Sequence, residues 1–146
     1  MNTATILDSK GHDVITATPN TSLIDIANLL AQYCIGCIVI VDDEDKVRGI
    51  FSEHDLIRAI GQGGPQVLKM PVSKFMTTAV VTARNTDTYD QLMSEMTTQE
   101  FRHMPVVEMD RLIGIVSIGD LVKMHVADAE LESTELQQHI STCGRH

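Results

Sequence analysis

The 146-residue chain has no tryptophan, and aromatic residues make up only 3% of it. Any core must therefore be aliphatic, and the material for one is present, since 43% of the residues are hydrophobic and eight are methionine. Lysine and arginine are scarce as well, 11 against 20 aspartates and glutamates, which gives a formal net charge of −9. This balance argues against binding to nucleic acid or to an anionic membrane, because both need a basic face.

No apolar run approaches the roughly 18–20 residues that a membrane-spanning helix needs, and the first residues lack the basic and apolar segments of a secretory leader. Three cysteines in such a chain do not suggest a disulfide framework, so we expect a protein of the reducing cytoplasm. Catalytic motifs are missing too: there is no Gly-x-Ser-x-Gly elbow, no phosphate loop ending in Gly-Lys-Ser/Thr and no His-Glu-x-x-His. We therefore expect no catalytic residue and no metal site.

What the chain does contain is an internal repeat. Residues 14–17 (VITA) resemble residues 80–83 (VVTA), and an apolar stripe at helical spacing follows in each copy, within residues 23–30 and 89–96. Good N-cap residues precede both stripes, at 21–22 and 87–88. Short runs rich in β-branched residues, 38–42 and 104–108, then predict strands that end in acidic turns.

The clearest match ends each copy, where residues 49–56 (GIFSEHDL) align with residues 114–121 (GIVSIGDL). A strand ends at the serine and a helix begins directly after it, so each copy is predicted to have the order β-α-β-β-α, with residues 61–65 as the break between copies. We divide the chain into repeat 1 (1–62), repeat 2 (63–127) and an acidic C-terminal helical tail (128–146). We expect an α/β fold in which the repeats pack face to face, with pseudo-two-fold symmetry, around a common core.

Two Ser-x-x-Asp sequences, at Ser52 with Asp55 and at Ser117 with Asp120, are the first chemical candidates. Each could be a capping box, in which the serine caps the helix and the acid bonds back to the N-cap amide. The same geometry could bind a nucleotide, because amides at a helix N-terminus attract phosphate and a carboxylate there can accept both ribose hydroxyls. The duplicated Gly-Ile upstream favours the nucleotide, since a cap alone does not require it.

The repeated order of elements, together with the phrases GIVSIGDLV and RHMPVV, resembles a tandem cystathionine-β-synthase (CBS) domain pair, also called a Bateman module, over residues 5–127. Many such pairs bind AMP, ATP, NAD or S-adenosylmethionine between their repeats, and they often form disc-like dimers of two pairs. The resemblance therefore implies a non-catalytic regulatory module with an AMP-like ligand foremost, a homodimer, and an effector protein that reads the ligand-bound shape.

The resemblance also implies two unequal sites, each combining the Asp of one repeat with strand ends of the other. Site one would comprise Ser52, His54, Asp55, Met76, Thr77, Val81, Arg102, His103, Met104 and Pro105. There Arg102 offers a charged fork for phosphate, His103 a second donor if protonated, and Met104 a surface for the adenine ring. His54 stands where related sequences often carry arginine. The histidine is expected to weaken the binding of a phosphate in this site.

Site two would comprise Ile15, Gly36, Cys37, Ile38, Ser117 and Asp120. Gly36 and Cys37 stand where Arg102 and His103 stand in site one, so no base would face a phosphate. Site two should therefore prefer a less charged ligand, bind weakly or stay empty.

Two alternatives stay open. The chain could be a ligand-free dimerisation or protein-interaction module whose Ser-x-x-Asp sequences are plain helix caps. Cys34 and Cys37 have the C-x-x-C spacing of a thiol switch or of half a metal site. That pair lies at the end of a helix rather than at its start, where the dipole would lower a thiol pKa, so small packing residues are the simpler interpretation.

Overall fold

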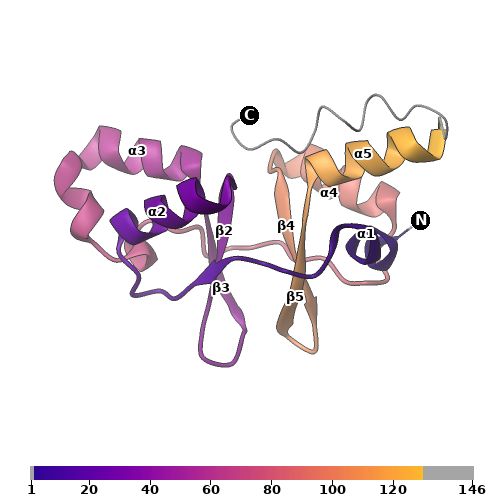
Figure 1. Ribbon diagram of the computed structural model, residues 1–146, viewed down its shortest axis with the longest axis horizontal. Helices are drawn as coiled ribbons and strands as arrows, with labels where there is room; N and C mark the ends of the chain where they lie inside the picture. The colour runs from indigo at the N-terminus through magenta and orange to yellow at the C-terminus, as the bar shows by residue number, and fades with distance from the viewer. Residues whose placement is uncertain (1, 130–146) are drawn as a thin grey trace.

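Two α/β units lie side by side, with their β-hairpins adjacent at the centre of the molecule (Figure 1). The computed structural model describes residues 2–129, so the tail expected at 128–146 lies outside the described residues except for the two that end the last helix. The predicted α/β class is confirmed. None of the described helices is long and apolar enough to cross a lipid bilayer.

The first unit follows the predicted order, with β1 (Thr16–Ala17), α2 (Leu23–Tyr33), β2 (Cys37–Val41), β3 (Val47–Ser52) and α3 (Glu53–Gly63). β2 is the central strand, parallel to β1 and antiparallel to β3. Ser22 caps α2 by accepting from the Asp25 amide, as expected for a residue just before the apolar stripe. α3 runs to Gly63, so the break between the units begins at Gly64, whose φ of +79° suits glycine.

The second unit contains α4 (Tyr89–Gln99), β4 (His103–Glu108), β5 (Arg111–Ser117) and α5 (Ile118–Ala129). The strand predicted at 80–83 is wrong, because only Ala83 pairs with β4, through one parallel bridge to Val106. The Ala83 amide donates to the Pro105 carbonyl, and the Val107 amide donates to the Ala83 carbonyl. The next bond of a parallel ladder would need an N–H from Pro105, and proline has none.

Each unit is completed by a segment from outside its own repeat. α1 (Thr3–Lys10), which we did not predict from the sequence, lies beside β5 and α5 (Figure 1). Its Ile6 and Leu7 are almost fully buried within the hydrophobic cluster of the second unit. α1 therefore belongs to repeat 1 by sequence and to the second unit by packing.

The first residues of repeat 2 pack on the first unit in the same manner. It forms two 3-10 turns, η1 (Pro65–Lys69) and η2 (Val72–Lys74), whose Val67 and Val72 join the first hydrophobic cluster. Thr77 then pairs with Ile50 of β3 through two backbone hydrogen bonds of 2.9 Å. The two units thus exchange the segments with which their repeats begin.

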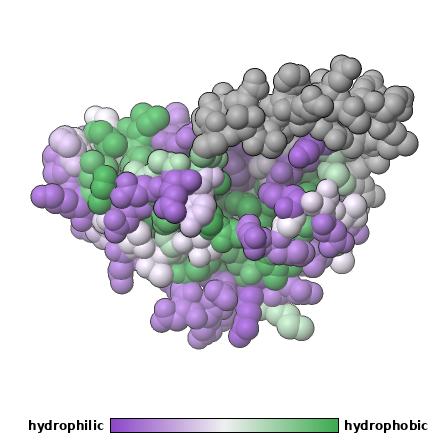
Figure 2. Space-filling model, viewed as in Figure 1, coloured by the Kyte–Doolittle hydropathy of each residue, from purple (hydrophilic) through white to green (hydrophobic). Residues whose placement is uncertain are grey.

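The buried aliphatic side chains form two clusters, one in each unit, instead of the common core that we expected. On β2, Ile38 and Ile40 point into the first cluster, while Cys37, Val39 and Val41 on the opposite face are buried outside both clusters. Because side chains alternate along a strand, one face of β2 serves its own unit and the other faces away from that core. Hydrophobic side chains gather between the two units in Figure 2.

A glycine at the same place in each unit lets the exchanged segment approach. A Cβ added at Gly49 would lie 2.6 Å from Met76 Sδ, and one added at Gly114 would lie 2.7 Å from Leu7 Cδ2. Carbon atoms in ordinary contact are about 3.5–4.0 Å apart, so neither site admits a side chain without movement. This close packing gives the repeated glycine a structural reason, and its duplication is not by itself evidence for a nucleotide.

Candidate functional site

Ser52 and Asp55 begin α3 as a complete capping box. The Asp55 amide donates to Ser52 Oγ at 3.1 Å, and the Ser52 amide donates to Asp55 Oδ2 at 2.9 Å. Asp55 Oδ1 accepts from Arg58 at 3.2 Å. An ionised carboxylate has about four lone-pair sites, so Asp55 keeps acceptor capacity for a ligand beyond the two bonds that its carboxylate accepts.

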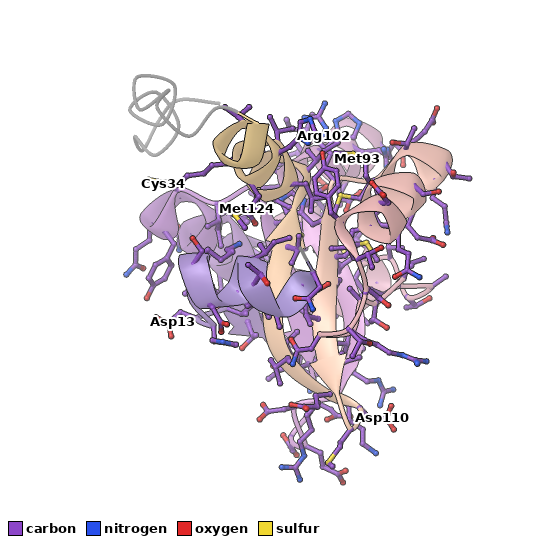
Figure 3. The ribbon with its side chains drawn as sticks, turned by 90° about the vertical axis from the view of Figure 1, so that its right-hand side faces the viewer. Asp13, Cys34, Met93, Arg102, Asp110 and Met124 are labelled. Atoms are coloured by element: carbon purple, nitrogen blue, oxygen red, sulfur yellow. The ribbon has the colours of Figure 1, made fainter. Side chains whose placement is uncertain are left out.

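A cleft with a volume of about 790 Å³ lies beside this cap, between the two units. This volume falls in the range of about 300–1,000 Å³ that is typical of small-molecule sites. Arg102 stands at one end of β4, opposite the hairpin tip that carries Asp110 (Figure 3). The lining residues are Gly36, Cys37, Ile50, Ser52, Glu53, His54, Asp55, Ile57, Thr77, Ala79, Val80, Val81, Gln99, Glu100, Phe101, Arg102 and His103.

Most of the residues predicted for site one come together here. Those that line the cleft are Ser52, His54, Asp55, Thr77, Val81, Arg102 and His103. The acid of the first repeat therefore shares one cleft with Arg102 and His103 of the second, which is the crossed arrangement that the resemblance implies. Whether a ligand contacts these side chains stays a prediction.

Three residues assigned to site one do not line the cleft. Met104 is only 2% exposed and packs in the second cluster, because it neighbours His103 on a strand and so points to the opposite face. Met76 packs against the first cluster beside Gly49, and Pro105 is buried in β4. We therefore correct the prediction that Met104 packs on an adenine ring.

The sequence interpretation missed several lining residues next to those that it named. They are Ile50 and Glu53 beside Ser52, Ile57 one turn into α3, Ala79 and Val80 before Val81, and Gln99, Glu100 and Phe101 before Arg102. Glu100 ends α4 with a left-handed φ of 58°, as Cys34 ends α2 with a φ of 53°. Most of these residues lie directly before a residue that was assigned to the site, so a longer segment before each assigned residue would have included them.

His103 is half-buried in the cleft, and its pKa is lowered. Burial is the main cause; Lys10 and Arg102 act in the same direction, and Asp120 and Glu53 oppose them. At neutral pH the imidazole is therefore uncharged and offers one N–H donor. This corrects the idea of a protonated second donor beside Arg102.

Folding stability should fall as the pH drops below 6.5, partly through His103. The unfolded histidine, with its ordinary pKa of 6.5, binds a proton before the folded one does, so acid favours unfolding. Thermal unfolding of wild type and His103→Gln between pH 7.5 and 5.5 measures this effect, and the variant should lose less stability. The exposed His54→Gln is the matched control and should keep the wild-type slope; equal slopes in all three proteins would contradict the assignment.

The second Ser-x-x-Asp sequence also forms a capping box, with the same distances of 2.9 and 3.1 Å between Ser117 and Asp120. Its environment differs, because Asp120 Oδ2 lies 2.6 Å from Lys10 Nζ. A cation therefore reaches the second acid, although the sequence interpretation placed no base near it.

The strand residues assigned to site two lie elsewhere. Gly36 and Cys37 line the cleft of Asp55, because the Gly36 carbonyl accepts from the Glu53 amide at 2.9 Å and Cys37 pairs with Ser52. Ile38 is fully buried in the first cluster and Ile15 packs against that cluster. The start of β2 therefore joins the site of its own unit, which the crossed assignment did not allow for.

Cys37 is a free, buried cysteine, and burial, assisted by the nearby Asp55 carboxylate, raises its pKa to about 12. A redox-active thiol needs a lowered pKa, so this environment does not suit the proposed thiol switch. Among the residues that the structure describes, no group of three or more His, Cys, Asp and Glu side chains could hold a metal ion.

The Cys37 thiol should resist alkylation in the native protein. A rise of the pKa to about 12 leaves on the order of 10³-fold less thiolate than an ordinary cysteine has at pH 8. Iodoacetamide labelling followed by peptide mass spectrometry should find Cys37 unmodified in the native protein and fully modified in urea. Equal labelling rates in the two states would contradict the assignment.

Comparisons with known proteins agree with this architecture. The CBS domain model matches residues 10–62 and 72–126. The crystal structure of the CBS-domain containing protein ATU1752 from Agrobacterium tumefaciens is 43% identical, with a TM-score of 0.82 over 86% of this chain and 99% of that chain. The CBS domain-containing protein YhcV of Bacillus subtilis is 28% identical over 119 residues, 81% of this chain and 83% of YhcV. The CBS domain pair of protein MJ0100, in complex with 5′-methylthioadenosine and S-adenosyl-L-methionine, is 26% identical, with a TM-score of 0.78 over 88% of this chain and 98% of that pair.

Proposed function

Because this chain belongs to the CBS domain family, we propose that it is a non-catalytic regulatory module that binds an adenosyl ligand in the cleft beside Asp55. The observation that carries the proposal is the meeting of the Ser52–Asp55 cap from one unit with residues 99–103 of the other, in one cleft of about 790 Å³. Support for the ligand class comes from the CBS pair of protein MJ0100, which holds two adenosyl compounds.

Asp55 is the proposed acceptor for the ribose hydroxyls. Its bond to the Ser52 amide fixes the carboxylate, while its partner Arg58 has a side chain that is 54% exposed. Exposed ion pairs contribute about 0–1 kcal/mol, so a ligand could displace Arg58 at little cost. Ile50, Ile57 and Val81 supply apolar walls for the base, and Arg102 is the cation for a phosphate.

The charges that line the cleft favour a ligand with few phosphates. Glu53, Asp55 and Glu100 carry three carboxylates against the single guanidinium of Arg102, and His103 is uncharged at neutral pH. Each additional phosphate charge is repelled by this balance. Among adenine nucleotides we therefore propose AMP as the ligand and expect ATP to bind more weakly.

Isothermal titration calorimetry with AMP, ATP, NAD and S-adenosylmethionine tests the proposal. AMP should bind more tightly than ATP, and the difference should shrink between 50 and 500 mM salt because salt screens charges at the cleft mouth. The absence of binding by all four compounds at millimolar concentration would refute an adenosyl site. Tighter binding of ATP than of AMP would refute the charge argument alone.

Regulation would follow from the place of the cleft between two units. A ligand that touches both units favours one arrangement of them, by as much as its affinities for the two arrangements differ. We propose that an effector protein in the cytoplasm reads this arrangement and that the module is a homodimer. Exposed Ile60 on α3 and Val122 on α5 support a paired surface, and Figure 2 shows hydrophobic side chains over α3.

A ligand-free interaction module is the second candidate, and the completeness of both capping boxes favours it, since neither acid needs a ligand to be satisfied. A thermal-shift assay separates the two candidates. A ligand present at 100 times its Kd should stabilise the protein by about 2.7 kcal/mol, whereas a ligand-free module should show no shift.

A further inference from the structure

Asp120, the counterpart of Asp55, already has a cationic partner within the chain. Lys10 Nζ lies 2.6 Å from Asp120 Oδ2 and donates to the Ile115 carbonyl at 2.9 Å. The two side chains are 30% and 21% exposed, so the pair is partly shielded from water. A short charge-assisted bond in such a place is stronger than a fully exposed ion pair.

The fold holds this lysine in position from a distance. Lys10 is the last residue of α1, where a cation also interacts favourably with the helix dipole. Leu7, one turn earlier, is fully buried against Gly114 and anchors the helix on the second unit. The packing of α1 on the second unit therefore positions the ammonium group of Lys10 beside Asp120.

In the first unit, a backbone amide makes the bond that the Lys10 ammonium makes to a strand carbonyl in the second unit. The carbonyl of Ile50, the counterpart of Ile115, accepts from the backbone amide of Thr77. Met76 meets Gly49 as Leu7 meets Gly114, but the chain after Met76 is not helical and continues through Thr77 to Ala79. Ala79 lines the open cleft and carries no group that could reach Asp55.

We propose that Lys10 is the internal occupant of the second Ser-x-x-Asp site, so that the wild-type chain offers one adenosyl site instead of two. The ammonium is bonded to Asp120 Oδ2, which also accepts from the Ser117 amide, so a ribose hydroxyl would meet a carboxylate that already has a cation beside it. A ligand that displaced it would break two hydrogen bonds and leave the Ile115 carbonyl without its lysine partner. This inference rests on the proposed function of the first cleft.

Calorimetry with AMP and with S-adenosylmethionine, each as the probe, tests the inference through stoichiometry. Wild type should bind one equivalent, and Lys10→Met, which keeps an unbranched side chain one atom shorter and removes its charge, should bind two. The second equivalent should disappear in Lys10→Met with Asp120→Ala. When Lys10→Met is added to Asp55→Ala, the affinity for the probe should rise at least tenfold above that of Asp55→Ala alone.

Two further variants serve as controls for this experiment. Lys10→Arg keeps a cation beside Asp120 and should keep one equivalent, and Lys69→Met removes an exposed lysine at the end of η1 and should also keep one. Circular dichroism melting establishes that each variant is folded.

The possible outcomes separate this inference from the proposed function. Three results would overturn the inference while the first site remains: Lys10→Met binds only one equivalent of the probe, wild type binds two equivalents, or removal of the lysine weakens probe binding at Asp120. If wild type binds neither probe, the proposed function fails. The inference then survives only if Lys10→Met binds a probe through Asp120, and it is overturned otherwise.

Discussion

Replacing Asp55 by alanine should weaken AMP binding about 10- to 100-fold, whereas Asp120→Ala should leave the affinity unchanged. A hydrogen bond to a charged group contributes about 1.5–3 kcal/mol, and about 1.4 kcal/mol corresponds to a factor of ten. Asp55 shares the cleft with Arg102 and His103, while Asp120 is paired with Lys10. Calorimetry at constant salt measures both affinities.

Asp120→Ala is an unusually close control, because the two capping boxes have the same hydrogen-bond distances. Each alanine removes the acid's bond to the N-cap amide, and Asp120→Ala also removes the partner of Lys10, so Asp120→Ala should lose at least as much stability as Asp55→Ala. A loss of affinity that merely followed this loss of stability would occur in both variants. Weakened binding in Asp120→Ala with normal binding in Asp55→Ala would show that the cleft was assigned to the wrong acid.

Leu7→Ala should lower the free energy of unfolding by about 2–5 kcal/mol. Leu7 has no exposed surface and packs in the second hydrophobic cluster, although it belongs to the first repeat by sequence. Its neighbour across the contact is Gly114, which has no side chain that could move into the vacated space. The cavity should therefore persist, which places the expected loss toward the upper part of this range.

Urea unfolding followed by circular dichroism measures the loss, and Asp8→Ala is the control on the same helix. The Asp8 side chain is 80% exposed, so its removal should change stability by less than about 0.5 kcal/mol. A loss below about 1 kcal/mol in Leu7→Ala would contradict the docking of α1 on the second unit. An equal loss in both variants would indicate a general effect on the helix instead.

Local patterns in the sequence predicted most of the helices and strands, because they depend on neighbouring residues. The stripe after Ser22 and the Ser-x-x-Asp at Ser52 are examples, and both caps form as predicted. The repeat alignment then placed Asp55 with Arg102 and His103, since equivalent elements of two similar units meet in equivalent ways.

The errors concern contacts between segments that are distant in the sequence. α1 has no clear apolar stripe, and its role depends on contacts with the second unit that no local pattern shows. Lys10 reaches an acid 110 positions away, so the second site appeared to lack a base. The strand expected at 80–83 fails because of one proline on its partner, and Met104 was misplaced because its neighbour His103, not Met104, faces the cleft.

The exchange of the first segment of each repeat between the two units bears on the order in which the units can be completed during synthesis. The first unit has all of its parts once the ribosome has made Thr77, which pairs with Ile50. α1 is made first, yet its contacts with Gly114, Ile115 and Asp120 cannot form until those residues emerge. The earliest helix therefore cannot complete its packing until β5 and the start of α5 have emerged, and translation of nearly the whole described chain must finish before the Lys10–Asp120 pair can form.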